Sequence, residues 1–219
     1  MSVQPKFDYT NFKRYKMLDV IRPIGNLLCK TYYKVEFRGL ENLDRKDGFI
    51  IAPNHVSEFD PLFIAMASKR LFHYIAKYEL FENPLLNKAM THSNAFPIVR
   101  GKGDLNAIRY GIELIRRGEV LCIFPEGTRS ENGMPQKAKS GVGYIARYTG
   151  ADIIPAGIYM ENKGKFGSKV VVKFGKAIKN SELGFTDGGK TKENKLAANM
   201  VMEEITKLWE ECANVNNSC

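Results

Sequence analysis

The chain has 219 residues, of which 44% are hydrophobic and 26% are charged, so it can bury a full core and does not have the composition of a disordered protein. Its formal net charge of +9 favours an anionic partner: nucleic acid, a phosphorylated metabolite or an acidic membrane surface. The four cysteines are scattered, with no Cys-x-x-Cys pair, which argues against a zinc site or disulfide framework and for a reducing compartment.

The first 33 residues form a basic segment. Over residues 8–33 the apolar side chains recur at helix-face spacing, which predicts a helix, and Pro23 inside the pattern predicts a kink or two short helices. Such a segment suits a membrane interface or the surface of its own domain, and the pattern does not distinguish them. We divide the chain into an N-terminal amphipathic, membrane-associating helical segment (1–33), an α/β domain (34–213) and a flexible tail (214–219).

Strands and helices then alternate. Apolar and β-branched runs predict strands, and amphipathic stretches that begin at Asn, Asp or Pro predict helices. The predicted strands are 33–38, 48–53, 73–76, 95–99, 120–124, 153–158 and 169–174, the predicted helices are 61–69, 83–91, 104–117, 141–148 and 192–212, and 179–192 reads as a loop. This alternation predicts an α/β fold with a mostly parallel central sheet flanked by helices on both faces.

The stretch from Asn54 to Asp60 follows the apolar strand predicted at 48–53. In open α/β sheets, ligands bind beyond the carboxyl ends of the strands. His55 precedes Asp60 by five residues, so the carboxylate can hold one imidazole nitrogen while the other accepts a proton from a substrate hydroxyl. The same residues also suit a helix start, with Asp60 as N-cap before Pro61 and His55 as a polar loop residue.

Three further predicted strands end in unusual residues, within the stretches 96–101, 124–130 and 154–157. Arginine forks match phosphate oxygens, and glycines let the backbone approach an anion or a developing oxyanion. Each stretch alone also has the residue types of an ordinary turn, so a purely structural role stays open for each of them.

Taken together, four blocks resemble the motifs of the glycerolipid acyltransferase family typified by 1-acylglycerol-3-phosphate (lysophosphatidic acid) acyltransferases. The matching residues are Asn54-His55-x4-Asp60, Phe96-Pro97-x-x-Arg100-Gly101, Phe124-Pro125-Glu126-Gly127-Thr128-Arg129-Ser130 and Ile154-Pro155, within residues 30–180. The first and third blocks are specific. The fourth is weak and departs from the family pattern, because Ala156-Gly157 stand where a bulkier apolar residue often follows the proline. Lys77, and Lys139 with Gly141, also resemble recurrent family positions.

The resemblance implies transfer of a fatty acyl group from an acyl thioester, on acyl carrier protein or coenzyme A, to the free hydroxyl of 1-acylglycerol 3-phosphate. The product is phosphatidic acid, a phospholipid precursor, and no metal or further cofactor is implied. The catalytic residues would be His55 as general base and Asp60 as its partner. Arg129, Arg100 and Lys77 would bind the acceptor phosphate. Glu126 would bind the glycerol or pair with Arg129. The substrate site would be lined by Gly101, Gly127 and Thr128. Backbone amides near Gly101 and Gly127 would serve as oxyanion donors.

Other interpretations stay open. The acceptor can instead be glycerol 3-phosphate or another lysophospholipid, or the chain can be a non-catalytic basic module that binds membrane surfaces. Nucleic-acid binding is disfavoured, since the basic residues form no aromatic-studded recognition motif. A covalent route is disfavoured because there is no Gly-x-Ser-x-Gly motif. We expect a peripheral or monotopic protein on the cytoplasmic face of the cell membrane, since no apolar run reaches the ~18 residues of a spanning helix.

Overall fold

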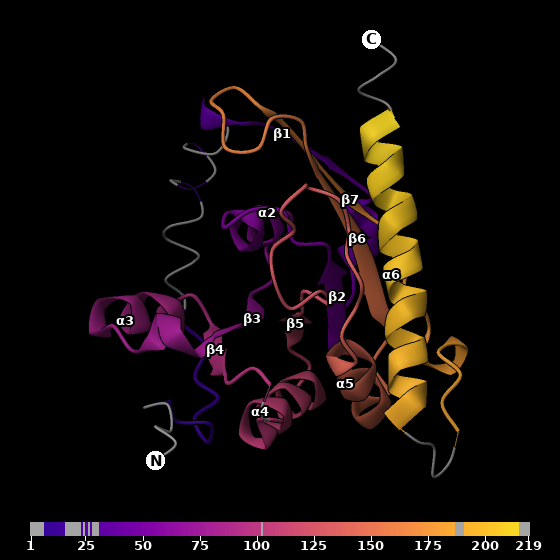
Figure 1. Cartoon of the computed structure of the whole chain (residues 1–219). Coiled ribbons are helices and arrows are strands. Elements are labelled where there is room, and N and C mark those ends of the chain that lie inside the picture. Colours follow the sequence, from indigo (N-terminus) through magenta and orange to yellow (C-terminus); the bar gives the residue numbers. More distant parts are fainter. Residues whose placement is uncertain are drawn as a thin grey trace.

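The structure is a computed structural model that describes residues 7–15, 23, 25, 27, 31–101, 103–186 and 191–214. A seven-stranded sheet with the order β1-β7-β6-β2-β5-β3-β4 forms its centre (Figure 1). The strands are β1 (Lys34–Arg38), β2 (Phe49–Pro53), β3 (Phe72–Lys77), β4 (Ala95–Ile98), β5 (Val120–Cys122), β6 (Ile153–Met160) and β7 (Lys169–Phe174). The helices are α2 (Asp60–Met66), α3 (Pro84–His92), α4 (Leu105–Arg116), α5 (Gly141–Thr149) and α6 (Thr191–Asn214), with short 3-10 helices at Leu40–Leu43, Tyr78–Phe81 and Asn180–Glu182.

The sheet is mostly parallel, as predicted. Strands β6, β2, β5, β3 and β4 run in one direction, β7 is antiparallel to β6, and β1 is parallel to β7. The carboxyl ends of the five parallel strands therefore meet at one edge of the sheet, which we call the carboxyl edge. Because β1 and β7 run the other way, both of them begin at this same edge.

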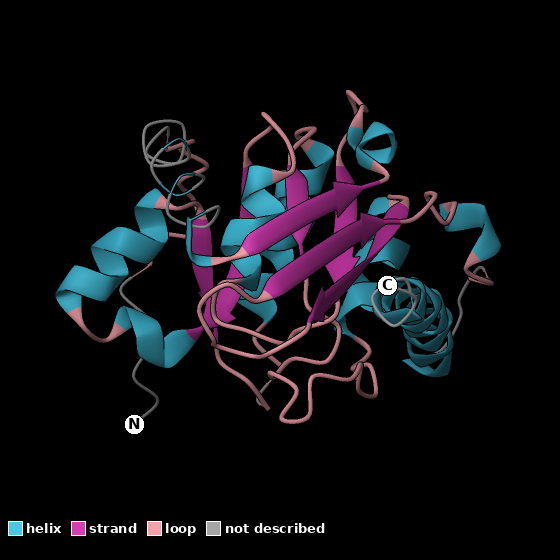
Figure 2. Ribbon diagram, turned by 90° about the horizontal axis from the view of Figure 1, so that it is seen from above, coloured by secondary structure: helices cyan, strands magenta, loops and turns pink. Residues whose placement is uncertain are grey.

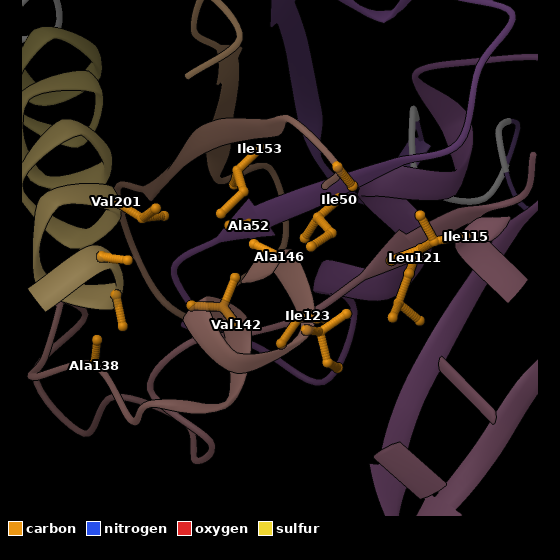
Figure 3. Packing of buried hydrophobic residues seen from close by; sticks show 14 of the residues in the cluster. Ile50, Ala52, Ile115, Leu121, Ile123, Ala138, Val142, Ala146, Ile153 and Val201 are labelled. Atoms are coloured by element: carbon orange, nitrogen blue, oxygen red, sulfur yellow. The ribbon is translucent and has the colours of Figure 1, made fainter. Parts of the chain in front are cut away.

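Helices cover both faces of the sheet. Along β2, Phe49 and Ile51 belong to one buried cluster and Ile50 and Ala52 to another, since successive side chains of a strand point to opposite faces. The first cluster packs against α2, and the second against α4, α5 and α6 (Figure 3). Seen from above, α3 and α6 lie on opposite sides of the molecule, α3 beside β4 and α6 along β6 and β7 (Figure 2).

The prediction of a helix from residue 8 is wrong for residues 8–15, which are irregular. This strap packs on the α/β domain instead: the Tyr9 hydroxyl donates to the carbonyl of Pro97 at 2.9 Å, and the Phe12 ring stacks on Tyr110. Its apolar side chains thus have partners in the domain, and the backbone follows those partners rather than the helical spacing.

Most of the remaining N-terminal segment lies outside the described residues, as do the predicted kink around Pro23 and residues 215–219 of the predicted tail. Pro23, Gly25 and Leu27 themselves are helical. Helix α6 continues to Asn214, one residue beyond the predicted domain end. Within the described ranges, no helix has both the length and the apolar character that crossing a bilayer requires.

Candidate active site

A histidine–aspartate pair lies where β2 ends and α2 begins. The Nδ1 atom of His55 is 2.7 Å from Oδ2 of Asp60. The same oxygen accepts hydrogen bonds from the backbone amides of Val56 at 2.7 Å and Ser57 at 2.8 Å. Asp60 is fully buried and is the first residue of the helix, not its N-cap. The helix-cap interpretation of Asp60 is therefore wrong, because its carboxylate turns back over the preceding loop and fixes the imidazole.

The position of this carboxylate decides which nitrogen of His55 can act. A carboxylate only accepts hydrogen bonds, so Nδ1 of the neutral imidazole carries the proton and Nε2 carries the free lone pair. The ring stacks on Phe124 with 4.1 Å between centroids, and 17% of the side chain is exposed. The imidazole is thus held on one face and at one nitrogen, and its remaining exposed part can meet a substrate.

Asn54 ties the turn to the sheet. Its side-chain amide donates to the carbonyl of Ile158 at 2.9 Å and accepts from the amide of the same residue at 2.6 Å. The side chain is fully buried and takes the place of a backbone partner at the end of β6. Sequence reasoning included Asn54 in the first motif but gave it no role; the structure makes it the clamp between β2 and β6.

Glu126 holds the backbone of His55. Its Oε1 atom accepts from the His55 amide at 2.9 Å, and the amide of Ser130 donates to the His55 carbonyl at 2.7 Å. The turn after β5 is therefore hydrogen-bonded to both the backbone amide and the backbone carbonyl of His55. The pKa of Glu126 is raised to about 7, chiefly by burial; the hydrogen bonds from the backbone at His55 and Gln136 lower it, and the nearby charge of Asp60 raises it.

Arg129 lies beside the same turn. Its Nη1 atom forms an ion pair with the carboxylate of Glu58, and about half of the arginine side chain is exposed. The expected pair between Arg129 and Glu126 is therefore wrong: the arginine pairs with Glu58, and Glu126 bonds to the backbone of His55. The structure nevertheless brings Arg129 to the His55–Asp60 turn, as the phosphate-binding prediction requires.

Gly127 and Thr128 form the tip of the turn after β5. Gly127 has φ +68°, a left-handed conformation that favours glycine, and its amide donates to the carbonyl of Phe124 at 3.0 Å. That amide closes the turn and is not available as an oxyanion donor. The side chain of Lys139 lies against Gly127: a Cβ added to this glycine would be 2.9 Å from Cδ of Lys139. Thr128 is exposed.

The remaining candidate residues lie further along the carboxyl edge. Lys77 ends β3 and pairs with Glu79 at 3.1 Å. Arg100 and Gly101 follow β4 and are exposed, and the charge of Arg100 contributes to lowering the pKa of Glu79. Strands β5 and β3 separate β4 from β2, which is about 14 Å at ~4.8 Å between strands. Arg129 follows β5 and Arg100 follows β4, so the two predicted phosphate-binding arginines lie on one edge, with β3 between the strands that carry them.

The described part of the chain contains no group of three His, Cys, Asp or Glu side chains suited to holding a metal ion. Cys122 is fully buried, and burial raises the pKa of its thiol, in agreement with the prediction of a small hydrophobic core residue.

Comparison with known proteins gives a consistent result. The model of the Acyltransferase family matches residues 34–159. A Bacillus subtilis protein named 1-acyl-sn-glycerol-3-phosphate acyltransferase is 33% identical over 126 residues, which cover 57% of this chain and 62% of that protein. A chloroplastic protein of that name from Arabidopsis thaliana is 29% identical over 66% of this chain and 41% of its own length. The chain thus matches less than two thirds of the length of these relatives.

A solved structure agrees in fold. The crystal structure of the 1-acyl-sn-glycerophosphate (LPA) acyltransferase PlsC from Thermotoga maritima superposes with a TM-score of 0.71 at 28% identity, over 90% of this chain and 79% of that one. The matched family region contains the His55–Asp60 turn, both arginine-bearing turns and most of β6. The chain therefore belongs to the Acyltransferase family.

Proposed function

We propose that this chain transfers a fatty acyl group from an acyl thioester to the free hydroxyl of 1-acylglycerol 3-phosphate, giving phosphatidic acid. The observation that carries the proposal is the 2.7 Å contact between His55 and a fully buried Asp60 at the carboxyl edge of the sheet. The acceptor is supported by the names of the relatives from Bacillus subtilis and Arabidopsis thaliana and of the Thermotoga maritima structure.

In the proposed reaction, Nε2 of His55 removes the proton of the acceptor hydroxyl while the oxygen attacks the thioester carbonyl. The ester C–O bond forms, the C–S bond breaks, and the departing thiolate takes the proton back from the imidazolium. Asp60 stabilises the positive charge that appears on the ring. A positioned general base of this kind contributes about 10²- to 10⁴-fold in rate.

The leaving group explains why the scheme needs no metal or organic cofactor. A thiol has a pKa near ~8.5, so its thiolate departs with little assistance from an acid. The donor is a thioester of acyl carrier protein or coenzyme A, and both present the same reacting group. Direct transfer between two bound substrates is then sufficient.

The acceptor phosphate is assigned to the cations of the carboxyl edge. Arg129 is the nearest candidate, since its partner Glu58 lies between His55 and Asp60 in the chain. A guanidinium fork can exchange that carboxylate for two phosphate oxygens. Lys77 and Arg100 lie one and two strands further out than β5 and suit the approach of the anionic headgroup. We place the protein on the cytoplasmic face of the cell membrane, because the acceptor is a lipid.

The decisive experiment compares His55→Ala with His92→Ala, a matched control at the end of α3. Purified protein is supplied with acyl thioesters on both carriers and with lysophosphatidate, glycerol 3-phosphate or other lysophospholipids, and the acylated product is measured. We expect transfer to lysophosphatidate, a loss of at least ~10²-fold in His55→Ala and none in His92→Ala. Full activity of His55→Ala would exclude the general base, and absence of product with the native chain would exclude the function.

A further inference from the structure

Exposed aromatic side chains gather beside the active site. Phe166, Phe59 and Tyr32 expose 75%, 48% and 42% of their surface. Their rings are linked in a row through the buried Tyr33: the centroid distances are 5.4 Å for Phe166–Tyr32, 4.7 Å for Tyr32–Tyr33 and 6.0 Å for Tyr33–Phe59. We call these four residues the aromatic ridge. It extends from the loop between β6 and β7 to the turn that carries His55.

Hydrogen bonds fix the loop that presents Phe166. The amide of Gly167 donates to the carbonyl of Tyr32 at 2.7 Å, and the Tyr32 hydroxyl donates to the carbonyl of Gly164 at 3.2 Å. The amide of Lys34 donates to the carbonyl of Ser168 at 3.0 Å. The loop therefore lies against the start of β1 (Figure 1, the orange loop beside the indigo strand). Phe166 is exposed on a loop that these hydrogen bonds fix in place.

The same loop is connected to the catalytic turn. The ammonium of Lys163 donates to the carbonyl of Ser130 at 2.8 Å, and the amide of Ser130 donates to the carbonyl of His55 at 2.7 Å. The position of the aromatic ridge is thus tied to the position of the general base, and whatever the ridge contacts is held next to the reaction.

The charges around the ridge are mostly positive. Lys163 and Lys165 precede Phe166 in the loop, and Lys34 is exposed where β1 begins. Glu161 is the acid of this loop. Aromatic rings that remain in water beside lysines are typical of surfaces that enter a lipid interface, where the ring is buried at headgroup depth and the ammonium meets anionic lipid.

We propose that the aromatic ridge, together with Lys34, Lys163 and Lys165, is a surface that inserts into an anionic phospholipid bilayer and keeps the His55 turn at headgroup level. The inference rests on the proposed function in that the acceptor is a lipid, and it names a contact surface that, apart from Tyr32 and Tyr33, lies outside the N-terminal segment. An acidic carrier protein fits less well, because the outermost group of the ridge is a phenyl ring whose apolar surface a lipid interface satisfies.

The test measures binding of the full chain to vesicles by flotation. We expect Phe166→Ala to weaken binding to vesicles of phosphatidylcholine with phosphatidylglycerol about tenfold. The matched control is Leu85→Ala on α3, a side chain that is 81% exposed but lies away from the ridge, and it should bind like the native chain. Equal losses in both variants, or none in Phe166→Ala, would overturn the proposal.

A second pair of variants tests the charge. Lys165→Gln should weaken binding to the anionic vesicles about fivefold and leave binding to pure phosphatidylcholine unchanged, whereas Lys46→Gln, an exposed lysine before β2, should change neither. If Lys165→Gln instead raises KM for acyl carrier protein thioesters and leaves vesicle binding unchanged, the surface belongs to the carrier protein and the membrane proposal is wrong.

Turnover separates this inference from the proposed function. Phe166→Ala should acylate a monodisperse short-chain lysophosphatidate at the native rate and lose activity on long-chain lysophosphatidate in vesicles. If the native chain binds vesicles through Phe166 but acylates neither acceptor, the surface stands and the proposed function fails. If the native chain acylates both and Phe166→Ala does so equally well, the function stands and the surface is wrong.

Discussion

Among the acidic residues of this site, Glu126 has a pKa that its environment shifts strongly. It is 2% exposed, and its pKa is raised from 4.5 to about 7, mainly because burial disfavours the charged carboxylate. The folded state therefore holds this proton more tightly than the unfolded state does. The corresponding stabilisation is fully present below pH 4.5 and is lost as the pH rises through about 7.

Glu126→Gln tests this linkage. The amide oxygen can still accept from the His55 backbone, while the titration disappears. As the pH rises from 4.5 to 8, we expect the free energy of unfolding of the variant to increase by on the order of 2 kcal/mol relative to that of the native chain, because charging the buried carboxyl destabilises only the native chain. Denaturant unfolding at the two pH values measures it. A stability difference that does not change with pH would show that the pKa of Glu126 is the same in the folded and unfolded states.

Arg129 and Arg100 make different predictions because of where they lie. Arg129 contacts Glu58 in the His55–Asp60 turn, whereas Arg100 follows β4, three strands from β2. We expect Arg129→Ala to raise KM for lysophosphatidate at least tenfold, since a hydrogen-bonded charge pair contributes about 1.5–3 kcal/mol, and Arg100→Ala to raise it less. Arg129→Lys should restore little, because an ammonium lacks the guanidinium fork. If Arg100→Ala raised KM more than Arg129→Ala, the phosphate site would lie closer to β4.

At the scale of elements, the sequence predicts what local chemistry determines. The starts of α3 and α4 were predicted within one residue, and side chains explain both: Asn83 caps the first helix and Asp104 the second. The motifs after β2, β4 and β5 lie at the carboxyl edge as predicted, since parallel strands bring their ends together. The prediction that the stretch 154–157 ends a strand is wrong, because these residues lie inside β6, which continues to Met160. The strap at 8–15 was missed, because its apolar spacing looks helical while its partners are distant in the sequence, on α4 and β4.

The partners inside the site were the other part that spacing could not predict. Glu126 bonds to the His55 backbone and Arg129 to Glu58, and both contacts depend on how two turns from different strands face each other. Asn54 reaches Ile158 for the same reason. A motif therefore indicates which residue types converge, and the turn geometry decides which atoms meet.

The contact between β6 and α6 gives an element-scale prediction. A Cβ at Gly157 would lie 2.6 Å from the backbone nitrogen of Trp209, and backbone cannot yield as a side chain tip does. Gly157→Ala should destabilise the fold by about 1–3 kcal/mol through overpacking. Gly141→Ala, where the added Cβ meets nothing within 4 Å, is the control and should be neutral or stabilising. Thermal unfolding of both variants decides; equal melting temperatures would mean that α6 does not pack this closely on β6.

At the scale of the whole molecule, several cations lie at the carboxyl edge of the sheet. The chain carries +9, and several of its cations, among them Lys77, Arg100, Arg129, Lys163 and Lys165, follow or end strands at the carboxyl edge or lie in its loops. The aromatic ridge lies at the same edge. Long-range attraction to an anionic bilayer and short-range insertion of rings therefore act on one side of the molecule, the side on which His55 is exposed.

This arrangement predicts two separable parts in membrane binding. Screening shortens the electrostatic range from about 10 Å at 0.1 M salt to about 3 Å at 1 M, whereas burial of apolar surface does not weaken with salt. Binding of the native chain to anionic vesicles should fall at least tenfold over this range and level off at the affinity measured on neutral vesicles. Phe166→Ala should show the same slope at a uniformly lower affinity, because it removes only the apolar part. A salt-independent affinity, or a Phe166→Ala curve that converges with the native one at 1 M, would mean that charge and rings do not contact the bilayer together.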